Sequence, residues 1–297
     1  MSFKSGFISA TGRPNVGKST LINKLTGRNI SIISDKPQTT RNVIKSILTG
    51  EDHQMVFMDT PRIQTPRNRL GEYLKNIAHE TLNDVDIILF TTDAEQTRPG
   101  EIDKNIIKNL KMIKSPVLLV INKIDKIDKK QLLPIIKNFS EAYDFEGVFP
   151  VSAKTGDGLE ELKKEIIRLL PEGPKYFPDD MITDQPERVL AAEIIREKLI
   201  NVLEQEIPHG IGVEINVFKE RPNGKITDIS ATVFCEKKSH KGMVIGKNGQ
   251  LLKKIGEKSR KDIEKIFGTQ IYLQLWVKVK DDWRNDEQML KKLGFER

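Results

Sequence analysis

One nine-residue stretch constrains the fold of this 297-residue chain more than any other feature. It reads GRPNVGKST, from Gly12 to Thr20, and fits the pattern G-x-x-x-x-G-K-[ST]. A strand-like run, GFISAT, precedes it and a helix-like segment, Lys18–Gly27, follows. A glycine-rich turn between strand and helix gathers backbone N–H groups at the positive end of the helix dipole, where phosphate binds. The chain must therefore build a sheet that carries a phosphate loop at one strand end.

The first 170 residues continue this alternation of apolar runs and amphipathic segments. The predicted strands are GFISAT, MVFMD, DIILFTTD, PVLLVIN and GVFPVSA, and VIKSILTG could add an antiparallel strand before MVFMD. The predicted helices are Lys18–Gly27, Arg69–Asp84, Glu101–Ile113, Lys130–Tyr143 and Gly158–Leu170. Apolar strands that alternate with helices predict an α/β domain with a mainly parallel sheet covered on both faces.

The second half has a different pattern. Four prolines and a glycine within LLPEGPKYFPDDMITDQPERV indicate an interdomain linker. A long helical segment, PERVLAAEIIREKLINVLEQEI, follows, and then two strand-like runs, GVEINVF and ITDISATVFCE, joined by the turn signal RPNGK. A basic helical region and a last strand, IYLQLWVKV, complete a smaller α+β domain. We predict domains at 1–172 and 187–297, with a linker at 173–186.

The composition and charge of the chain bear on its compartment and on the kind of partner it binds. A single cysteine, Cys235, excludes an internal disulfide and suits a reducing compartment. No apolar run reaches about 18 residues and no signal peptide is evident, so we expect a cytoplasmic protein. Residues 237–265 hold ten Lys/Arg against three Asp/Glu, an excess that equals the formal charge of the whole chain, +7. Such a local excess favours a polyanion partner, with a solvated helix face as the ordinary alternative.

Two short motifs at predicted strand ends select the base. NKID, Asn122 to Asp125, offers a carboxylate that can accept hydrogen bonds from guanine N1–H and the exocyclic amine, which adenine cannot donate in that geometry. SAK, Ser152 to Lys154, could place a backbone amide on the guanine oxygen. In the phosphate loop, Lys18 would reach the β- and γ-phosphates, and Ser19 would supply a hydroxyl to Mg²⁺. The motifs together predict a guanine nucleotide site.

These motifs, with QTTR, VSAKTGDGL and the second domain, resemble the Era family of Ras-like GTPases over nearly the whole chain. The resemblance implies that Thr40 joins Mg²⁺ and the γ-phosphate, with Thr39 as the fallback, and that Asp59 holds Mg²⁺ through water. It implies that Lys18, Thr40, Asp59 and Asn15 support catalysis. The implied nucleotide contacts are Gly12, Asn15, Val16, Gly17, Lys18, Ser19, Thr20, Asp59, Asn122, Lys123, Asp125, Ser152, Ala153 and Lys154.

Arg62 departs from the resembled family, which has glycine at the end of the MDTP run. The glycine amide turns to meet the γ-phosphate, and arginine would adopt such a positive-φ geometry at a cost of about 1–2 kcal/mol. Three interpretations stay open: a switch that converts poorly between states, a tolerated change, and an internal arginine finger. An engineered or mutant origin is a further alternative. Ile63 cannot orient water by hydrogen bonding, but the family shares that hydrophobic residue.

Asn15 resembles an asparagine that in related GTPases helps to hold K⁺ near the phosphates. Such an ion would add positive charge to the transition state. A loop-stabilising asparagine is the ordinary alternative.

The stretch VIGKNGQLLKKIG, Val244 to Gly256, places Gly246 and Gly249 around Lys247 and Asn248 before a basic helix. A tight helix–helix turn could produce the same spacing. In its context of strands and helices it resembles a KH domain of prokaryotic topology, whose G-x-x-G loop clamps about four nucleotides of single-stranded nucleic acid. The implied RNA-binding residues are Lys241, Val244, Ile245, Gly246, Lys247, Asn248, Gly249, Lys253 and Lys254.

Apolar residues beside this loop must form a groove for bases. Val244, Ile245, Leu251 and Ile255 are candidates, with core packing as the ordinary role of most of them. Five lysines could contact phosphates, with a solvated surface as the ordinary alternative: Lys237, Lys238, Lys241, Lys253 and Lys254.

The aromatic and histidine side chains give weaker signals. Trp276 lies in an alternating strand and is expected in the core, whereas Trp283, within KDDWRND, is expected nearer to solvent. None of the four histidines has a partner at metal-ligand spacing, so we predict no metal site held by the protein alone.

The leading hypothesis is a GTP-hydrolysing switch with Mg²⁺, and with K⁺ as an open addition. Resemblance to Era implies binding near the 3′ end of 16S ribosomal RNA and a role in small (30S) subunit biogenesis. We expect a monomer, and the family leaves weak peripheral association with the inner membrane open. The rival hypothesis is an RNA-binding assembly chaperone with bound guanine nucleotide and negligible turnover because of Arg62.

Overall fold

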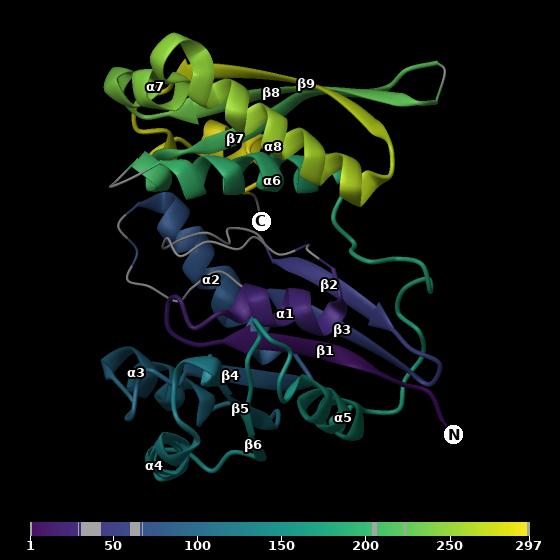
Figure 1. Cartoon of the computed structure of the whole chain (residues 1–297), viewed down its shortest axis with the longest axis vertical. Coiled ribbons are helices and arrows are strands. Elements are labelled where there is room, and N and C mark those ends of the chain that lie inside the picture. Colours follow the sequence, from purple (N-terminus) through teal and green to yellow (C-terminus); the bar gives the residue numbers. More distant parts are fainter. Residues whose placement is uncertain are drawn as a thin grey trace. The chain divides into compact units, whose positions relative to one another are not determined.

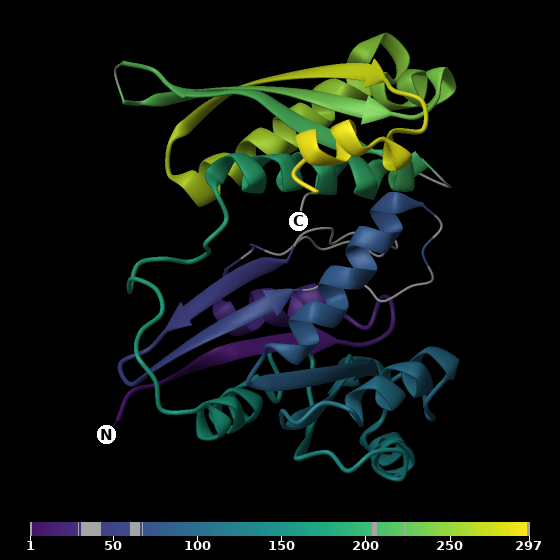
Figure 2. The same cartoon turned by 180° about the vertical axis from the view of Figure 1, so that it is seen from behind.

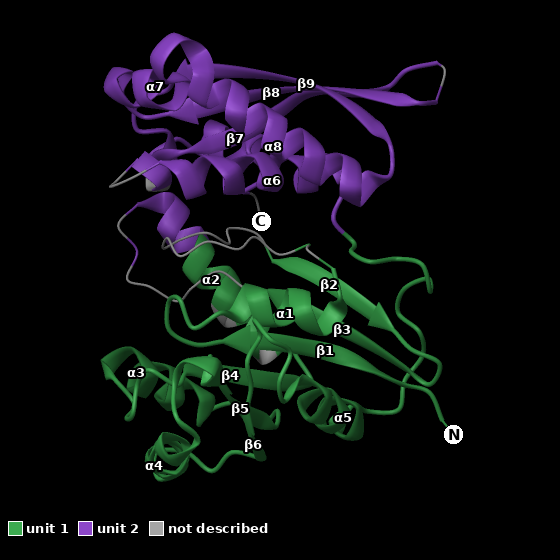
Figure 3. Ribbon diagram, in the orientation of Figure 1, with its two compact units in different colours: residues 1–33, 40–64, 74–184 green, residues 34–39, 65–73, 185–297 purple. Residues whose placement is uncertain are grey.

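The computed structural model describes residues 2–28, 30, 43–59, 66, 68–203, 207–222 and 224–295. Thr39, Thr40, Arg62 and Ile63 lie outside the described residues, so the predictions made for them stay predictions. The chain divides into two compact units, coloured separately in Figure 3. Unit 1 comprises residues 1–33, 40–64 and 74–184, and unit 2 comprises residues 34–39, 65–73 and 185–297.

Unit 1 contains a six-stranded sheet in the order β2-β3-β1-β4-β5-β6. Its strands are β1 Lys4–Thr11, β2 Ile44–Thr49, β3 His53–Asp59, β4 Ile87–Asp93, β5 Val117–Asn122 and β6 Gly147–Pro150. All neighbours pair in parallel except β2, which runs antiparallel to β3. The predicted mainly parallel sheet and the added antiparallel strand are both present. Because β1, β3, β4 and β5 run the same way, their carboxyl ends meet at one edge.

Helices cover both faces of this sheet. They are α1 Lys18–Thr26, α2 Arg69–Asn83, α3 Glu101–Leu110, α4 Lys129–Ser140 and α5 Leu159–Leu169, with a short 3₁₀ turn, η1 Ile124–Lys126. Alternate residues of β4 explain the layering, since Leu89 packs with α1 and α5 whereas Phe90 packs with α3 and α4. Figure 1 shows α1 in front of the sheet, and Figure 2 shows α2 on the opposite face.

Unit 2 places helices against one face of a three-stranded sheet with the order β7-β8-β9. Its strands are β7 Gly212–Glu220, β8 Ile226–Cys235 and β9 Gln270–Val279, with β7 antiparallel and β9 parallel to β8. Its helices are α6 Glu187–Val202, α7 Lys238–Ile245, α8 Gln250–Phe267 and α9 Glu287–Lys292, with 3₁₀ turns η2 Ile207–Gly210, η3 Lys247–Gly249 and η4 Trp283–Asn285. The succession αββααβ is the predicted KH arrangement.

The segment predicted as linker has no long regular element, but residues 173–184 pack against unit 1. Gln54 at the start of β3 accepts hydrogen bonds from the backbone N–H groups of Tyr176 and Phe177 at 2.9 and 3.0 Å. Farther along, Ile47 N–H donates to the carbonyl of Ile182 at 2.9 Å. This segment therefore satisfies one backbone N–H of β2, the sheet's edge strand. No helix in the described part of the chain is long and apolar enough to cross a membrane.

The two tryptophan predictions are wrong. Trp276 is 59% exposed, because helices cover only one face of the sheet and its side chain lies on the other. Trp283 is fully buried, and its indole N–H donates to the carbonyl of Gly210 at 2.9 Å. Alternation along β9 correctly indicated two faces, but it did not indicate which face the core occupies.

Candidate nucleotide-binding site and nucleic-acid interface

The phosphate loop joins β1 to α1 at the carboxyl edge of the sheet. Gly17 caps α1 in a left-handed conformation (φ 93°), and an added Cβ would lie 2.4 Å from Nδ2 of Asn122, so only glycine fits. The first turn of α1 contains no acidic residue, so nothing of that sign competes with an anion at its N-terminus. The Lys18 ammonium donates to the carbonyls of Gly12 and Arg13 at 2.9 and 3.1 Å. The loop thus presents amides and a cation together, as phosphate binding requires.

Asn122 joins this loop to the two motifs that select the base. Its side chain is buried at the end of β5 and donates from Nδ2 to the carbonyl of Val16 at 2.7 Å. Its Oδ1 accepts from the backbone N–H groups of Lys123 and Ala153 at 2.8 and 2.9 Å. These hydrogen bonds hold the phosphate loop, the NKID segment and the SAK segment against one another. The predicted nucleotide contacts of Asn122 and Ala153 stay predictions.

Asp125 is the exposed carboxylate of the NKID motif, at η1. The Ser152 hydroxyl donates to its Oδ1 at 2.6 Å, and this hydrogen bond holds the pKa of the Asp125 carboxyl below its ordinary value. An ionised carboxylate with one oxygen fixed by Ser152 can accept the two neighbouring N–H groups of guanine. The Ser152–Asp125 hydrogen bond therefore joins the two motifs that are predicted to read the base, and we call them the base-reading unit.

The SAK segment follows β6 and supplies backbone amides. Ser152 N–H donates to the carbonyl of Asp157 at 2.9 Å, and Ala153 N–H is used by Asn122. Among the described residues, the backbone N–H of Lys154 is the one motif amide without an assigned acceptor. It is therefore the amide we assign to the predicted contact with the guanine oxygen.

The donors expected to hold Mg²⁺ are oxygen atoms, which suit a hard divalent cation. Ser19 lies in the first turn of α1, and Asp59 is buried at the end of β3, opposite Ala10 of β1 in the parallel register. Thr40 lies outside the described residues. Within the described ranges, no group of three or more His, Cys, Asp or Glu side chains could hold a metal ion. Mg²⁺ would therefore depend on the nucleotide phosphates as well as on these protein oxygens.

The G-x-x-G stretch of unit 2 forms a tight loop between α7 and α8. Gly246 has φ 73° and ψ 177°, a region that is essentially limited to glycine. An added Cβ there would lie 2.5 Å from Cβ of Leu251. Lys247 and Asn248 are exposed at the tip of the loop, and Asn248 has a positive φ of 51°. The loop thus offers an ammonium and a closely approachable backbone to a phosphate chain.

A groove of about 330 Å³ begins at this loop and runs between α8 and β9. Its lining residues are Gly249, Leu252, Lys253, Gly256, Glu257, Arg260, Leu273 and Leu275. Three half-buried leucines provide an apolar floor. At the rim Lys253 provides positive charge beside Glu257 and Arg260, and the Arg260 guanidinium is paired with Glu264 at 3.1 Å. Apolar floor and basic rim together suit bases and phosphates of a single strand.

The structure corrects the apolar set predicted for this groove. Val244 and Ile255 are fully buried in the core, and Ile245 and Leu251, which are partly buried, do not line the groove either. Leu252, Leu273 and Leu275 line the groove instead. Sequence reasoning missed them, although the helical spacing of Leu252 and Gly256 and the alternation of β9 could have indicated a shared face.

The predicted lysines divide by position. Lys253 lines the groove and Lys247 lies in the loop, whereas Lys241 and Lys254 are exposed outside the groove lining. Within the described chain, none of these four ammonium groups lies within ion-pairing distance of a carboxylate. Their charge is available to a polyanion.

Family models match both halves of the chain. A family model described as 50S ribosome-binding GTPase matches residues 7–123, and a KH domain model matches residues 206–284. GTPase Era of Ruminiclostridium cellulolyticum is 54% identical over 99% of this chain and 98% of its own length. GTPase Era of Clostridioides difficile is 52% identical, with 99% of each chain covered.

The chain belongs to the Era family of GTPases.

Solved Era structures resemble the whole chain. A crystal structure of Era in complex with MgGDPNP and nucleotides 1506–1542 of 16S ribosomal RNA has a TM-score of 0.94. It is 40% identical and covers 99% of this chain and 100% of its own. An Aquifex aeolicus Era variant bound to GDP.AlF4⁻ gives a TM-score of 0.95 with the same identity and coverage. The GTPase and KH halves predicted from sequence are therefore those of an Era-family protein.

Proposed function

We propose that this Era-family GTPase binds GTP with Mg²⁺ and single-stranded RNA near the 3′ end of 16S ribosomal RNA, and assists small (30S) subunit biogenesis. One observation carries the proposal: the chain has both a phosphate loop joined to a guanine-reading unit and a G-x-x-G groove. The solved Era that holds MgGDPNP and 16S RNA nucleotides together shares the fold of this chain over its full length.

Nucleotide binding follows from the residues in unit 1. Lys18 and the amides of the phosphate loop neutralise the phosphates, and Asp125 and the Lys154 amide read guanine. Ser19, Asp59 and Thr40 would hold Mg²⁺, which when bound draws charge from the transferring phosphoryl group. Lys18 is positioned to stabilise the same charge as it develops. Asn15, exposed in the loop, is the residue proposed to help hold K⁺.

RNA binding follows from unit 2. The loop of Gly246, Lys247, Asn248 and Gly249 would clamp the phosphate chain, and Leu252, Leu273 and Leu275 would receive the bases. The protein is proposed to act in the cytoplasm as a monomer, with weak peripheral association with the membrane as an addition.

Paired variants of the full chain test this assignment. Gly246→Asp combined with Lys247→Gln is expected to abolish binding of a 16S 3′-end oligonucleotide and to leave GDP affinity unchanged. Asp125→Asn is expected to do the reverse, because it removes the acceptor of guanine N–H groups. RNA affinity that survives the first pair of changes would overturn the KH assignment.

A second function is favoured by Arg62, where the family has glycine. An assembly chaperone with bound nucleotide and negligible turnover would bind RNA with the same affinity in its GDP and GTP-analogue states. The proposed switch predicts that RNA affinity depends on the γ-phosphate.

A further inference from the structure

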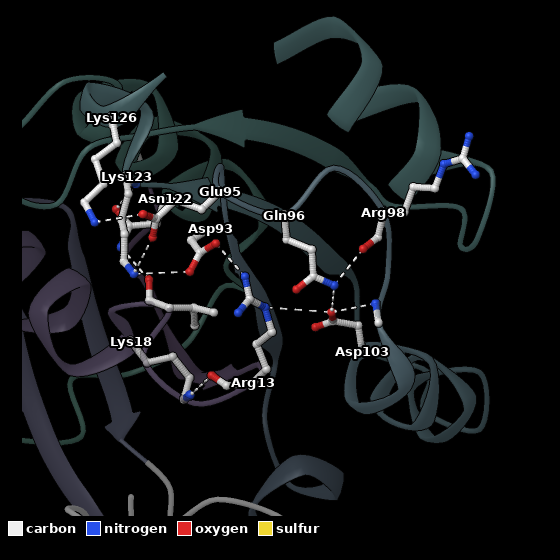
Figure 4. Close-up of polar contacts among 12 residues, drawn as sticks. Arg13, Lys18, Asp93, Glu95, Gln96, Arg98, Asp103, Asn122, Lys123 and Lys126 are labelled. Carbon is white, nitrogen blue, oxygen red and sulfur yellow. Dashed lines mark hydrogen bonds and ion pairs between the residues drawn. The ribbon is translucent and has the colours of Figure 1, made fainter. Parts of the chain in front are cut away.

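A chain of alternating charges connects three loops at the carboxyl edge of the unit 1 sheet (Figure 4). Its members are Asp103, Arg13, Asp93, Lys123, Glu95 and Lys126. Arg13 belongs to the phosphate loop, Lys123 belongs to the NKID motif, and the carboxylates come from β4, the loop after it and α3. The sequence analysis did not single out Arg13 or Asp93.

Asp93 lies at the centre of this chain. It is the last residue of β4, pairs in register with Asn122 of β5 and is only 3% exposed. Its Oδ1 accepts from Nη2 of Arg13 at 2.5 Å, and its Oδ2 accepts from Nζ of Lys123 at 3.2 Å. One buried carboxylate therefore holds a cation from the phosphate loop and a cation from the base-reading loop.

The Arg13 contact bears directly on the phosphate site. Its neighbour Gly12 and Arg13 itself supply the two carbonyls that accept from the Lys18 ammonium. A displacement of Arg13 would therefore move the groups that hold Lys18. The buried Asp103 lies on the other side of the guanidinium, with its Oδ2 at 3.9 Å from Nε of Arg13.

Asp103 is itself fixed. Its Oδ2 accepts from the backbone N–H of Gly100 at 3.0 Å and from Nε2 of Gln96 at 3.1 Å. The guanidinium thus lies between two immobilised carboxylates, and a planar fork suits that arrangement better than an ammonium does.

We propose that Asp93 is a positioning residue that couples the phosphate loop to the guanine-reading loop. A nucleotide binds with both ends at once, so the free energy of binding depends on how well the two loops are already placed relative to each other. Loss of the shared carboxylate removes one ion pair from each cation and weakens the link between the two loops, which then depends on Asn122, Asp103 and Glu95. The proposal rests on the assignment of these loops to guanine nucleotide.

The coupling makes a defined prediction for dissociation rates. Asp93→Asn is expected to raise the dissociation rates of GDP and of a non-hydrolysable GTP analogue by a similar factor, about tenfold. The single-turnover hydrolysis rate at saturating GTP should stay within about threefold of wild type, because Asp93 touches no reacting group. Arg13→Gln should behave similarly, and the double variant should be far less impaired than the product of the two factors predicts.

Two further variants separate positioning from general stability. Glu165→Gln removes an ion pair with Arg168 on α5 and should leave dissociation rates unchanged. Arg13→Lys keeps the charge but loses the fork, so its dissociation rates should lie between those of wild type and Arg13→Gln. If Asp93→Asn does not fold, Arg13→Lys and Arg13→Gln test the proposal in its place.

The possible results separate failure of the proposed function from failure of this inference. If wild type does not bind guanine nucleotide, the proposed function fails before this inference is reached. If wild type binds but Asp93→Asn changes only the melting temperature, or if the two single effects multiply in the double variant, Asp93 does not couple the loops and the inference is overturned.

Discussion

Replacing Gly246 with alanine tests the geometry of the KH loop most sharply. Gly246 has φ 73° and ψ 177°, where a residue with Cβ is strained by about 1–3 kcal/mol. The new Cβ would also lie 2.5 Å from Cβ and 3.2 Å from the backbone nitrogen of Leu251. Leu251 lies in the first turn of α8, so relief requires that helix to shift, and overpacking of this kind costs about 1–3 kcal/mol more. We expect Gly246→Ala to destabilise unit 2 by about 2–6 kcal/mol.

Gly249 offers a matched control in the same loop. It has φ 74° and ψ 4°, and an added Cβ would meet no atom within 4 Å. Gly249→Ala should therefore cost only the left-handed backbone strain, about 1–2 kcal/mol.

Urea unfolding followed by tryptophan fluorescence measures this difference. Both tryptophans, Trp276 and Trp283, belong to unit 2, so the signal reports on that unit alone. Gly246→Ala should also lower RNA affinity at least about tenfold, because the loop backbone no longer holds its clamping geometry. Equal unfolding midpoints for the two alanine variants would refute the reasoning.

Three further predictions follow from single contacts. Lys253→Gln should lower the salt dependence of RNA binding by about 0.7 in the log–log slope, whereas Lys258→Gln, on the same helix but outside the groove lining, should leave the slope unchanged. Because Ser152 keeps the pKa of Asp125 low, GDP affinity should stay flat as the pH falls from about 8 to about 5. In Ser152→Ala the pKa of Asp125 rises, so titrations should detect the loss of GDP affinity at a higher pH than in wild type. Loss of affinity that begins at the same pH in both proteins would contradict the role assigned to Asp125. Trp283→Phe should lower the stability of unit 2 by about 1–3 kcal/mol in calorimetry, since it loses a buried hydrogen bond and volume.

Much of the fold could be predicted because its signals are local. The phosphate loop, NKID and SAK each follow a strand, and parallel strands bring their carboxyl ends to one edge, so sequence order alone predicted that these three motifs meet. The contacts of each residue within a motif were harder to predict from the sequence. Asn122 bonds Val16, Lys123 and Ala153, which are brought together only by the sheet.

The groove shows the limit of periodicity. Val244 and Leu252 are both apolar residues on helices beside the loop, yet Val244 is core and Leu252 lines the groove. The difference depends on how α8 lies against β9, a pairing that no local spacing reports. Trp276 was misassigned for the same reason, because its exposure depends on which face of the sheet the helices cover. Trp283 was misassigned because its indole packs beside Gly210 and Gly212, which are distant in the sequence.

We propose that this chain is a working GTPase switch linked to RNA, and Arg62 is the residue most at odds with that function. The most direct test is single-turnover GTP hydrolysis with Mg²⁺, in K⁺ and then in Na⁺, with and without a 16S 3′-end RNA, beside Arg62→Gly. A working switch should give turnover that rises with RNA or with K⁺ and lies within about threefold of the variant. Tight GTP binding without turnover until glycine is restored would contradict it, and would leave an RNA binder held in one state.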